Sequence, residues 1–383
     1  MKNPLSNEVY LRRTKPTAAD IRSEYFRDQT KIIHSYPFRR LKHKTQVFYA
    51  PDNDHICTRI EHVLHVATIA ATICRGLNLS GADWELDTEL AYAIGLGHDL
   101  GHAPFGHEGE KELAAKLGEQ KTFIHELNSY RVVEHLANHG QGLNLTYAVK
   151  DGIICHNGED FAQNGLKPST VPNDLENIKD RAYVPCTYEG CIVRLSDQIA
   201  YLGRDIEDAV TAGFITKADV PPQVVKALGD SNTEIIGTLI SDIVERSKRS
   251  ESVGFSQEKH ALVLALGKFN YERIYYHPKL LKYRRHIRII IHTLFDYFLD
   301  LFAKHGRDFA AYEAMDLDVD RNFGRYVDQL QAVYEAEGYD AKTIVTDYIA
   351  GMTDSFALDC MRQISIPQPM HIRRPASKDP PAP

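Results

Sequence analysis

The sequence predicts an all-α protein. Apolar residues recur at helical spacing over several long segments, and no alternation of apolar and polar residues, which would indicate a half-buried strand, persists anywhere. The composition, with 43% hydrophobic and 25% charged residues, is ordinary for a globular protein. A chain of 383 residues is long enough to bury a sizeable core in one large domain or two modest ones.

The N-terminal elements are a polar arm and then helices. The polar composition of residues 1–20 predicts the arm, and a helical pattern begins at Ile21. A long amphipathic helix is predicted from about Thr58 to Leu77, because its apolar residues follow the i, i+3, i+4, i+7 spacing. The positions of this stripe are Ile60, Val63, Leu64, Ala67, Ala70, Cys74 and Leu77.

The next helix is predicted from Glu89 to about His98. It ends in a glycine-rich stretch, since Gly101 and Pro104 oppose its continuation. Further helices are expected to begin near Gly106 and near Asn128.

The rest of the chain is also predicted to be mostly helical. Residues 157–186 contain several Gly, Pro and Asn and predict an irregular excursion, whereas 190–212 are strongly helical. An apolar-rich helix is expected over 287–302, and it could be internal core or could cover a partner. The Pro-rich tail from 367 predicts disorder. These patterns suggest an arm (1–20), a helical core (21–215), a C-terminal helical part packed on that core (216–366) and a disordered tail (367–383).

Charge and cysteine content narrow the class of protein. A formal net charge of -7 excludes a global basic field that attracts nucleic acid. Local basic clusters at 39–42 and 282–285 are either solvated surface or phosphate contacts, so nucleic-acid binding stays open. None of the six cysteines forms a Cys-x-x-Cys pair, and we find neither an apolar leader nor a stretch of membrane-spanning length. We therefore expect a cytoplasmic protein.

The unusual count is 18 histidines, several of which cluster. Arg59 and His62 are three residues apart and share a helix face beside the apolar stripe. Taken alone, such a histidine is more often a hydrogen-bonded core residue than a ligand. The adjacent pair His98-Asp99 offers one nitrogen and one oxygen ligand, from a backbone that the flanking glycines allow to turn sharply.

More imidazoles and carboxylates follow this pair. His102, His107 and Glu110 can face the same centre, although a histidine-rich surface loop is the alternative. His125 precedes a glutamate, which suits either proton transfer or a favourable first helical turn.

A later helix carries Asp197, Tyr201 and Asp205 at i, i+4 and i+8. They share one helix face, which is either a cleft wall or a solvated acidic stripe.

Together these stretches predict a metal site. A set of imidazole and carboxylate ligands suits Mn, Fe, Co, Ni or Zn better than Mg. One such ion with open positions polarises a phosphate and lowers the pKa of a bound water, and nearby histidines can deliver a proton to the departing oxygen. Hydrolysis of a phosphate ester or anhydride is the chemistry that these groups favour.

The order of His62, His98-Asp99 and Asp197 resembles the H…HD…D signature of the HD-domain phosphohydrolases. Two segments are similar to deoxyguanosinetriphosphate triphosphohydrolases more closely. They are residues 27–48, with Phe-Arg-Arg-Leu and Lys-Thr-Gln-Val-Phe, and residues 98–110, with His-Asp-Leu-Gly-His-Ala-Pro-Phe-Gly-His-Glu-Gly-Glu. The resemblance, from about residue 11 to about 300, implies an HD-domain helical fold with additional C-terminal helices.

The resemblance also implies roles for single residues. The metal ligands would be His62, His98, Asp99 and Asp197. Residues in catalysis or around the α-phosphate would be His102, His107, Glu110 and His125. Substrate would be bound by Gln46, Arg59, Tyr201, Asp205 and Tyr275, with Arg59 against the phosphates, Gln46 and Asp205 at the sugar 3′-hydroxyl, and Tyr275 under the sugar.

The implied reaction is attack of water on the α-phosphorus of a dNTP, which gives a deoxynucleoside and triphosphate. The resemblance further implies a homo-oligomer and leaves a nucleotide effector open. One departure from the family pattern is Arg204, where many members have a histidine. Two alternatives remain: an HD nucleotidase or phosphodiesterase, for which His125 and His156 could supply ligands to a second metal, and a non-enzymatic nucleotide- or single-strand-binding regulator.

Overall fold

The computed structural model describes residues 1–48, 55–118, 121–157 and 162–367, and it confirms the all-α prediction. Within these ranges the only β-type pairings are two isolated bridges, Thr45 with Thr58 and Leu166 with Val253. The tail predicted to be disordered lies, beyond residue 367, outside the described residues.

The first half of the chain forms ten helices and three short turns in the described ranges. They are α1 (Asn7–Tyr10), α2 (Glu24–Ile33), α3 (Tyr36–Arg40), η1 (Leu41–His43), α4 (Arg59–Asn78), α5 (Thr88–Gly97), α6 (Gly106–Leu117), α7 (His125–Arg131), the π-helical turn η2 (Val132–Leu136), α8 (Ala137–Gly140), α9 (Tyr147–Ile154), η3 (Leu175–Asn177) and α10 (Tyr188–Thr211). The helix expected near Asn128 therefore begins three residues earlier, at His125.

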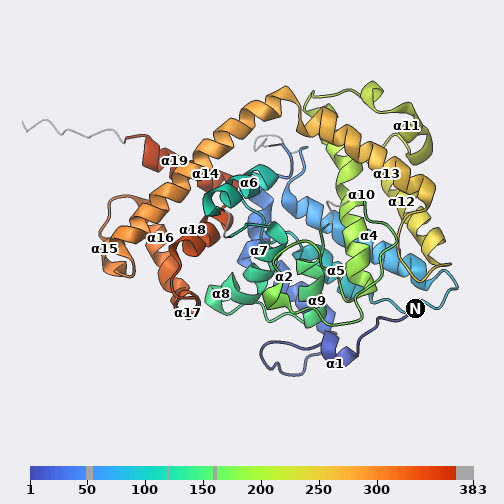
Figure 1. Cartoon of the computed structure of the whole chain (residues 1–383), viewed down its shortest axis with the longest axis horizontal. Helices are drawn as coiled ribbons and strands as arrows, with labels where there is room; N and C mark the ends of the chain where they lie inside the picture. Colours follow the sequence, from blue (N-terminus) through green and yellow to red (C-terminus); the bar gives the residue numbers. More distant parts are fainter. Residues whose placement is uncertain (49–54, 119–120, 158–161, 368–383) are drawn as a thin grey trace, which may run out of the picture.

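The second half continues with helices. They are η4 (Lys217–Asp219), α11 (Pro222–Leu228), α12 (Asn232–Ser247), α13 (Gln257–Asn270), the π-helical turn η5 (Tyr271–Tyr275), α14 (Pro278–His305), α15 (Phe309–Glu313), α16 (Asp318–Gln329), α17 (Gln331–Ala336), α18 (Ala341–Ala350) and α19 (Asp354–Ser365). In Figure 1, α14 crosses the molecule from the α15–α19 group to the neighbourhood of α13.

The first core forms around α4, which packs between α5 and α10. A capping box starts this helix: the Thr58 side chain and the Glu61 carboxylate satisfy backbone amides of the first turn. Most of the stripe is buried, whereas Leu64 is 38% exposed. The helical period places Leu64 beside the buried face rather than on it.

A second core gathers the C-terminal helices. The apolar face of α14, which includes Ile291, Leu294 and Phe298, is buried against α18 and α19 and also contacts α6. The 287–302 stripe is thus internal core. Since α6 carries His107 and Glu110, two of the predicted site residues, α14 links this second core to the site described below.

The N-terminal segment lies against the first core. Tyr10 is buried and donates a hydrogen bond from its hydroxyl to the Cys186 carbonyl at 2.9 Å. Arg13 pairs with the buried Asp28, whose carboxylate also accepts from the Thr146 amide.

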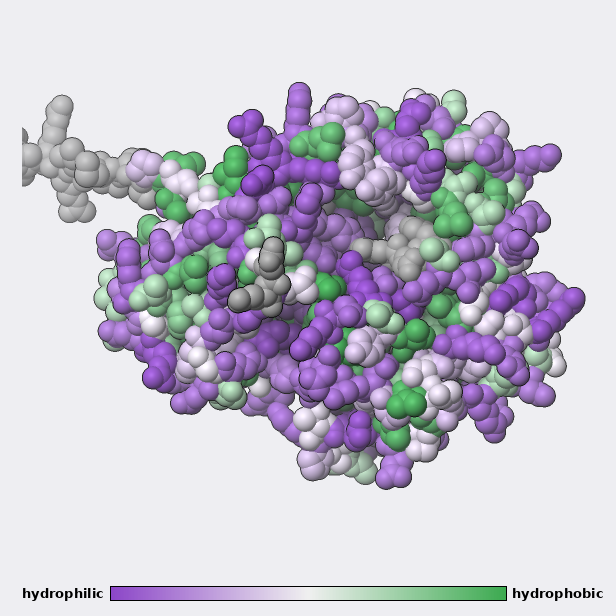
Figure 2. Space-filling view, viewed as in Figure 1, coloured by the Kyte–Doolittle hydropathy of each residue, from purple (hydrophilic) through white to green (hydrophobic). Residues whose placement is uncertain are grey.

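The exterior is mainly hydrophilic on the face shown in Figure 2, where hydrophobic residues form small separate patches. Among the described residues no helix combines the length and the apolar character needed to cross a membrane.

Candidate active site

The four predicted metal ligands converge from three helices. His62 lies in α4, His98 and Asp99 directly follow the last residue of α5, and Asp197 lies in the middle of α10. His62 Nε2 lies 2.9 Å from Asp197 Oδ1 and 4.0 Å from Asp99 Oδ2. His98 Nε2 lies 3.7 Å from Asp99 Oδ1 and 3.9 Å from Asp197 Oδ1. The structure therefore brings all four side chains together.

This donor set fits a divalent metal ion. The Nδ1 of His98 lies 2.8 Å from the Gly95 carbonyl, which orients Nε2 toward the two aspartates, as in many metal-binding histidines. This Nε2 is buried and makes no hydrogen bond with any described residue. The two carboxylate oxygens are too far from it for a hydrogen bond, but their spacing suits ligands that share one ion.

The protonation states also suit a metal. Burial lowers the pKa of His98 to about 4, so its imidazole is neutral at pH 7. Burial opposes ionisation of Asp197, but His62 holds its pKa at about 2. Asp99 is likewise buried, and the Arg59 guanidinium with the nearby imidazoles holds the pKa of its carboxyl well below the usual range.

Arg59 lies beside these ligands and is almost completely buried. Its Nη1 pairs with Asp99 Oδ2 at 2.5 Å, while Nε and Nη2 make no hydrogen bond with a described residue. A buried guanidinium with remaining donors is a favourable partner for an anion at the metal site.

The glycine-rich turn after α5 is shaped by close backbone contacts. A Cβ on Gly101 would lie 2.1 Å from the Ser129 amide nitrogen, so only glycine fits against α7. Asn128 donates from its side chain to the Gly101 carbonyl at 2.6 Å. Phe105 and Gly106 both have φ near +60°, which turns the chain into α6. The turn is therefore fixed by packing.

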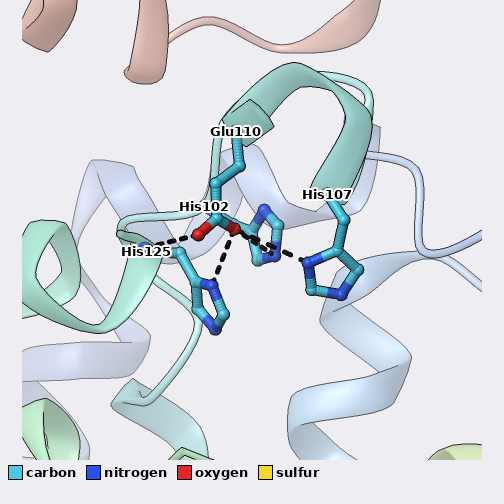
Figure 3. Close-up of side chains that lie close together, drawn as sticks. All are labelled: His102, His107, Glu110 and His125. Carbon is cyan, nitrogen blue, oxygen red and sulfur yellow. Dashed lines mark hydrogen bonds and ion pairs between the residues drawn. The ribbon is translucent and has the colours of Figure 1, made fainter. Parts of the chain in front are cut away.

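A second cluster lies beside the predicted metal ligands, since His125 Nε2 is 3.8 Å from Asp99 Oδ1. Its members are His102, His107, Glu110 and His125 (Figure 3). Glu110 Oε2 lies 2.9 Å from His125 Nδ1, 3.5 Å from His107 Nδ1 and 3.9 Å from His102 Nε2. The ring of His125 stacks on that of His102, with centroids 4.4 Å apart. Of the three histidines only His107, with 54% of its side chain exposed, is open to solvent.

His125 is the charged member of this cluster. Burial would lower its pKa, but Glu126 and Glu110 together raise it to about 10. Glu126 Oε2 lies 3.4 Å from His125 Nδ1. Burial lowers the pKa of His102 well below its usual value, and the Arg59 charge adds to this effect. The cluster thus holds one protonated and one neutral imidazole side by side, an arrangement suited to proton transfer.

The residues expected at the sugar line the same cavity. Tyr275, in η5, donates from its hydroxyl to Asp205 Oδ2, and Tyr201 lies one helical turn before Asp205 in α10. Burial raises the pKa of Asp205 to about 7. Gln46 lies in the segment that precedes α4, next to Thr45, which forms an isolated bridge with Thr58.

Most of the predicted site residues line one cavity of about 940 Å³. Its lining includes Gln46, Arg59, His62, Asp99, His107, Glu110, His125, Asp197, Tyr201, Asp205 and Tyr275. The two remaining predicted residues, His98 and His102, are fully buried.

Two polar residues at this site were not singled out as site residues by the sequence pattern. Arg181 lines the cavity from within the irregular 157–186 segment, where no periodicity marks a site residue. His156, considered only for a second metal, is buried with its Nε2 3.3 Å from that of His125. Only the fold brings either residue to the site.

Comparison with known proteins identifies the family of the chain. The HD domain model matches residues 59–202, and the phosphohydrolase-associated domain model matches residues 253–363. A deoxyguanosinetriphosphate triphosphohydrolase-like protein of Caldanaerobacter subterraneus subsp. tengcongensis is 37% identical over 364 residues, which cover 95% of this chain and 91% of that one. Proteins with the same description from Desulfatibacillum aliphaticivorans and Clostridium tetani are 36% and 33% identical, and they cover 94% and 95% of this chain and 92% and 91% of their own.

The HD domain match and the buried His/Asp cluster define the class of protein: a metal-dependent hydrolase that acts on phosphoric ester bonds. The similarity over nearly the whole chain is more specific. The chain belongs to the deoxyguanosinetriphosphate triphosphohydrolase-like family of HD-domain phosphohydrolases.

Proposed function

We propose that the protein is a dNTP triphosphohydrolase that cleaves a deoxynucleoside triphosphate to a deoxynucleoside and triphosphate. The observation that carries this proposal is that three kinds of group line one cavity. They are three of the four predicted metal ligands, three members of the second cluster (His107, Glu110 and His125), and the Asp205–Tyr275 pair. The predicted metal ligands suit the α-phosphate of a substrate molecule. The second cluster suits the reacting oxygens, and the Asp205–Tyr275 pair suits the sugar. The names of the curated relatives support the same substrate class.

Different site residues would act on the phosphate, on the attacking water and on the departing oxygen. One divalent ion, held by the two histidines and two aspartates, would polarise the α-phosphate and lower the pKa of the attacking water. Arg59 stabilises the charge on the phosphate oxygens with the donors that Asp99 leaves unused. Water forms the new bond to the α-phosphorus as the bond to the 5′-oxygen breaks. His107 and His125, which both line the cavity, deliver the proton that the departing 5′-oxygen needs.

The nature of the metal follows from its ligands. Two imidazoles and two carboxylates favour Mn, Fe, Co, Ni or Zn over Mg, which prefers oxygen ligands alone. We propose one such ion per chain.

Selectivity for a deoxy sugar is assigned to the Asp205–Tyr275 pair. Asp205 and Gln46 would accept and donate hydrogen bonds at the 3′-hydroxyl. The Tyr275 ring would lie under the sugar, where a 2′-hydroxyl is crowded. The hydrogen bond to Asp205 fixes the position of the Tyr275 ring.

The alternative is an HD nucleotidase or phosphodiesterase that acts on monophosphates or cyclic nucleotides. One observation favours it: His125, Glu126 and His156 lie close enough together to hold a second ion. Such an enzyme would release orthophosphate or open a cyclic ester, and it would not release triphosphate.

We also propose a homo-oligomer, on the tendency of the family alone. The apolar face of α14 lends no support, because it is covered inside the chain. Light scattering coupled to size-exclusion chromatography tests this proposal.

A product assay tests the proposed function. Purified protein with Mn is incubated with each dNTP and with GTP, and anion exchange separates the products. We expect deoxynucleoside and triphosphate from at least one dNTP and little turnover of GTP. Release of orthophosphate or pyrophosphate without triphosphate contradicts the proposal.

A further inference from the structure

The active-site cavity is also lined by apolar side chains at the end of α13 and the start of α14. Leu264 and Tyr271 line it from one face of α13 and its continuation η5, since they lie seven positions apart. Tyr276 lines it from the turn between η5 and α14. All three side chains are exposed. Exposed apolar side chains that gather at a cavity, rather than lying singly on the surface, indicate a surface for a ligand.

Tyr271, with 55% of its surface exposed, is the most open of the three. Its hydroxyl lies 2.9 Å from that of Tyr276, and the two ring centroids are 4.7 Å apart with the planes at 45°. The ring of Tyr275 meets Tyr271 at 89°, with centroids 6.5 Å apart. Neither of these two neighbours is stacked in parallel on the Tyr271 ring. A flat aromatic group of a ligand can therefore stack there.

Arg284 holds the neighbouring Tyr276 in place. Its guanidinium lies over the Tyr276 ring, 4.9 Å from the centroid. It also donates to the Tyr275 carbonyl at 2.9 Å and pairs with Glu108 of α6 at 2.7 Å. These contacts fix the guanidinium and cover one face of the Tyr276 ring. Because the Tyr276 hydroxyl is bonded to that of Tyr271, a fixed Tyr276 also restrains the Tyr271 ring.

Tyr275 connects this aromatic surface to the position proposed for the sugar. Its hydroxyl donates to Asp205, and its ring contacts that of Tyr271. A nucleotide carries its phosphates on the 5′-carbon of the sugar and its base on the 1′-carbon. With the α-phosphate at the predicted metal ligands, the base therefore leaves the sugar in a different direction. A nucleobase is flat and aromatic, and it suits a tyrosine ring better than it suits charged groups.

We propose that Tyr271 stacks on the base of the nucleotide substrate and that Tyr276 holds the Tyr271 ring in position. This assignment rests on the proposed function, since it requires the α-phosphate and the sugar to lie where that function puts them. Every nucleobase has a π-face, so the stack binds all four bases of DNA and does not choose among them by itself.

Steady-state kinetics of the manganese-loaded protein test the assignment with two probes. One is the preferred dNTP, and the other is 2-deoxyribose 5-triphosphate, which has no base. Tyr271→Leu keeps an apolar side chain but removes the ring. It should lower kcat/KM for the dNTP about 10- to 100-fold and leave kcat/KM for the base-free probe unchanged. If no dNTP is turned over, calorimetric titration with deoxyguanosine and with inorganic triphosphate makes the same comparison.

Two milder variants test the role of Tyr276. Tyr271→Phe and Tyr276→Phe break the same contact between hydroxyls and keep both rings. Each should lower kcat/KM for the dNTP by a similar, smaller factor of about 3, and neither should affect the base-free probe.

Tyr36→Leu is the control. Tyr36 is also exposed and also has an arginine at its ring, since the Arg39 guanidinium lies 5.4 Å from the centroid. It is not among the residues that line the cavity. This variant should turn over both probes as the wild type does.

Three results overturn the proposal. The first is an equal loss with both probes in Tyr271→Leu, because Tyr271 would then support the fold of the site. The second is an unchanged kcat/KM for the dNTP. The third is a change in molar mass by light scattering in Tyr271→Leu, which would make this surface a contact between copies of the chain. Tyr271→Met replaces Tyr271→Leu if the latter does not fold.

The product assay on the wild-type protein separates this proposal from the proposed function. Release of triphosphate together with equal losses for both probes contradicts the stacking alone. Other reaction products, together with a loss that is confined to substrates with a base, contradict the proposed function alone.

Discussion

The carboxylate of Asp354 accepts a hydrogen bond from the backbone amide of Phe105, 249 residues earlier in the chain, at 2.8 Å. The other carboxylate oxygen accepts from both the amide and the hydroxyl of Thr45. Thr45 and Phe105 both line the active-site cavity. The buried Lys44 makes a second connection to the C-terminal helices, because its ammonium group donates to the carbonyls of both His102 and Ala350. The C-terminal helices thus hold two segments of the HD site in place.

Asp354→Ala should lower the free energy of unfolding by about 2 to 4 kcal/mol, because the buried donors of Thr45 and Phe105 lose their acceptor. Turnover should fall as well, since both segments border the cavity. Urea denaturation measures the first effect. Asp359→Ala, exposed on the same helix, is the control and should change stability by less than about 0.5 kcal/mol. Equal stability of the two variants would show that the hydrogen bonds to Asp354 do not stabilise the folded protein.

Gly101→Ala should destabilise the protein by at least about 1 to 3 kcal/mol, because the new Cβ would collide with backbone atoms of α7 rather than with a movable side chain. The displaced turn should also bind metal less well. Thermal unfolding and metal analysis check both effects. The control is Gly237→Ala in α12, where a Cβ meets nothing within 4 Å. That variant should be as stable as the wild type or slightly more stable, owing to the higher helix propensity of alanine.

His98→Ala and Asp197→Ala should each lose bound metal, because each removes one of four ligands. We expect about one divalent ion per wild-type chain and a large loss in either variant, as measured by mass spectrometry of the purified proteins. Turnover should disappear in parallel. His65→Ala removes a histidine from the same helix as His62 and should keep the ion. Retention of metal by both ligand variants would place the metal elsewhere.

Tyr275→Phe should lower kcat/KM for a dNTP about 10-fold, because Asp205 loses a charge-assisted hydrogen bond. Tyr275→Ala should in addition narrow the preference for dNTP over NTP, since the ring that crowds the 2′-hydroxyl is gone. Steady-state kinetics with matched dNTP and NTP pairs measure both ratios. Tyr36→Phe, at an exposed position of α3, is the control. An unchanged sugar preference in Tyr275→Ala would remove Tyr275 from sugar recognition.

Glu189 predicts a pH dependence of stability. Burial raises its pKa from 4.5 to about 7, although it accepts hydrogen bonds from Asn3 and from the Asp87 amide. Between these two values the folded state keeps a proton that the unfolded state releases. The contribution of Glu189 is therefore greatest at low pH and is lost as the pH rises through about 7.

The measurement is a comparison of wild type with Glu189→Gln across pH. The glutamine does not titrate, so the variant should gain about 2 to 3 kcal/mol on the wild type between pH 5 and pH 8. Loss of one of the two hydrogen bonds adds an offset that does not depend on pH. Parallel stability curves for the two proteins would show that Glu189 ionises normally in the folded state.

Helix positions were predictable where the pattern was long and regular. The α4 helix begins and ends within a residue of its expected limits, because its capping box and apolar stripe are local features. The start of α7 was misplaced by three residues, since its first turn, with His125 and Glu126, is buried by tertiary contacts rather than marked by a cap. Leu64 belongs to the apolar stripe and is nevertheless exposed, because a one-dimensional stripe does not show how wide the buried face is.

The sequence by itself determined that the protein is helical, and it predicted the types and order of the proposed metal ligands, because residue type and spacing are local properties. Only the tertiary structure decided that the imidazoles of His62 and His98 lie within 4 Å of the Asp197 carboxylate. It also decided that Arg181 lines the same cavity and that Asp354 bonds to two segments of the cavity wall. These residues come from segments up to about three hundred positions apart. Their proximity results from the packing of α4, α5 and α10 in one core and of α14, α18 and α19 in the other.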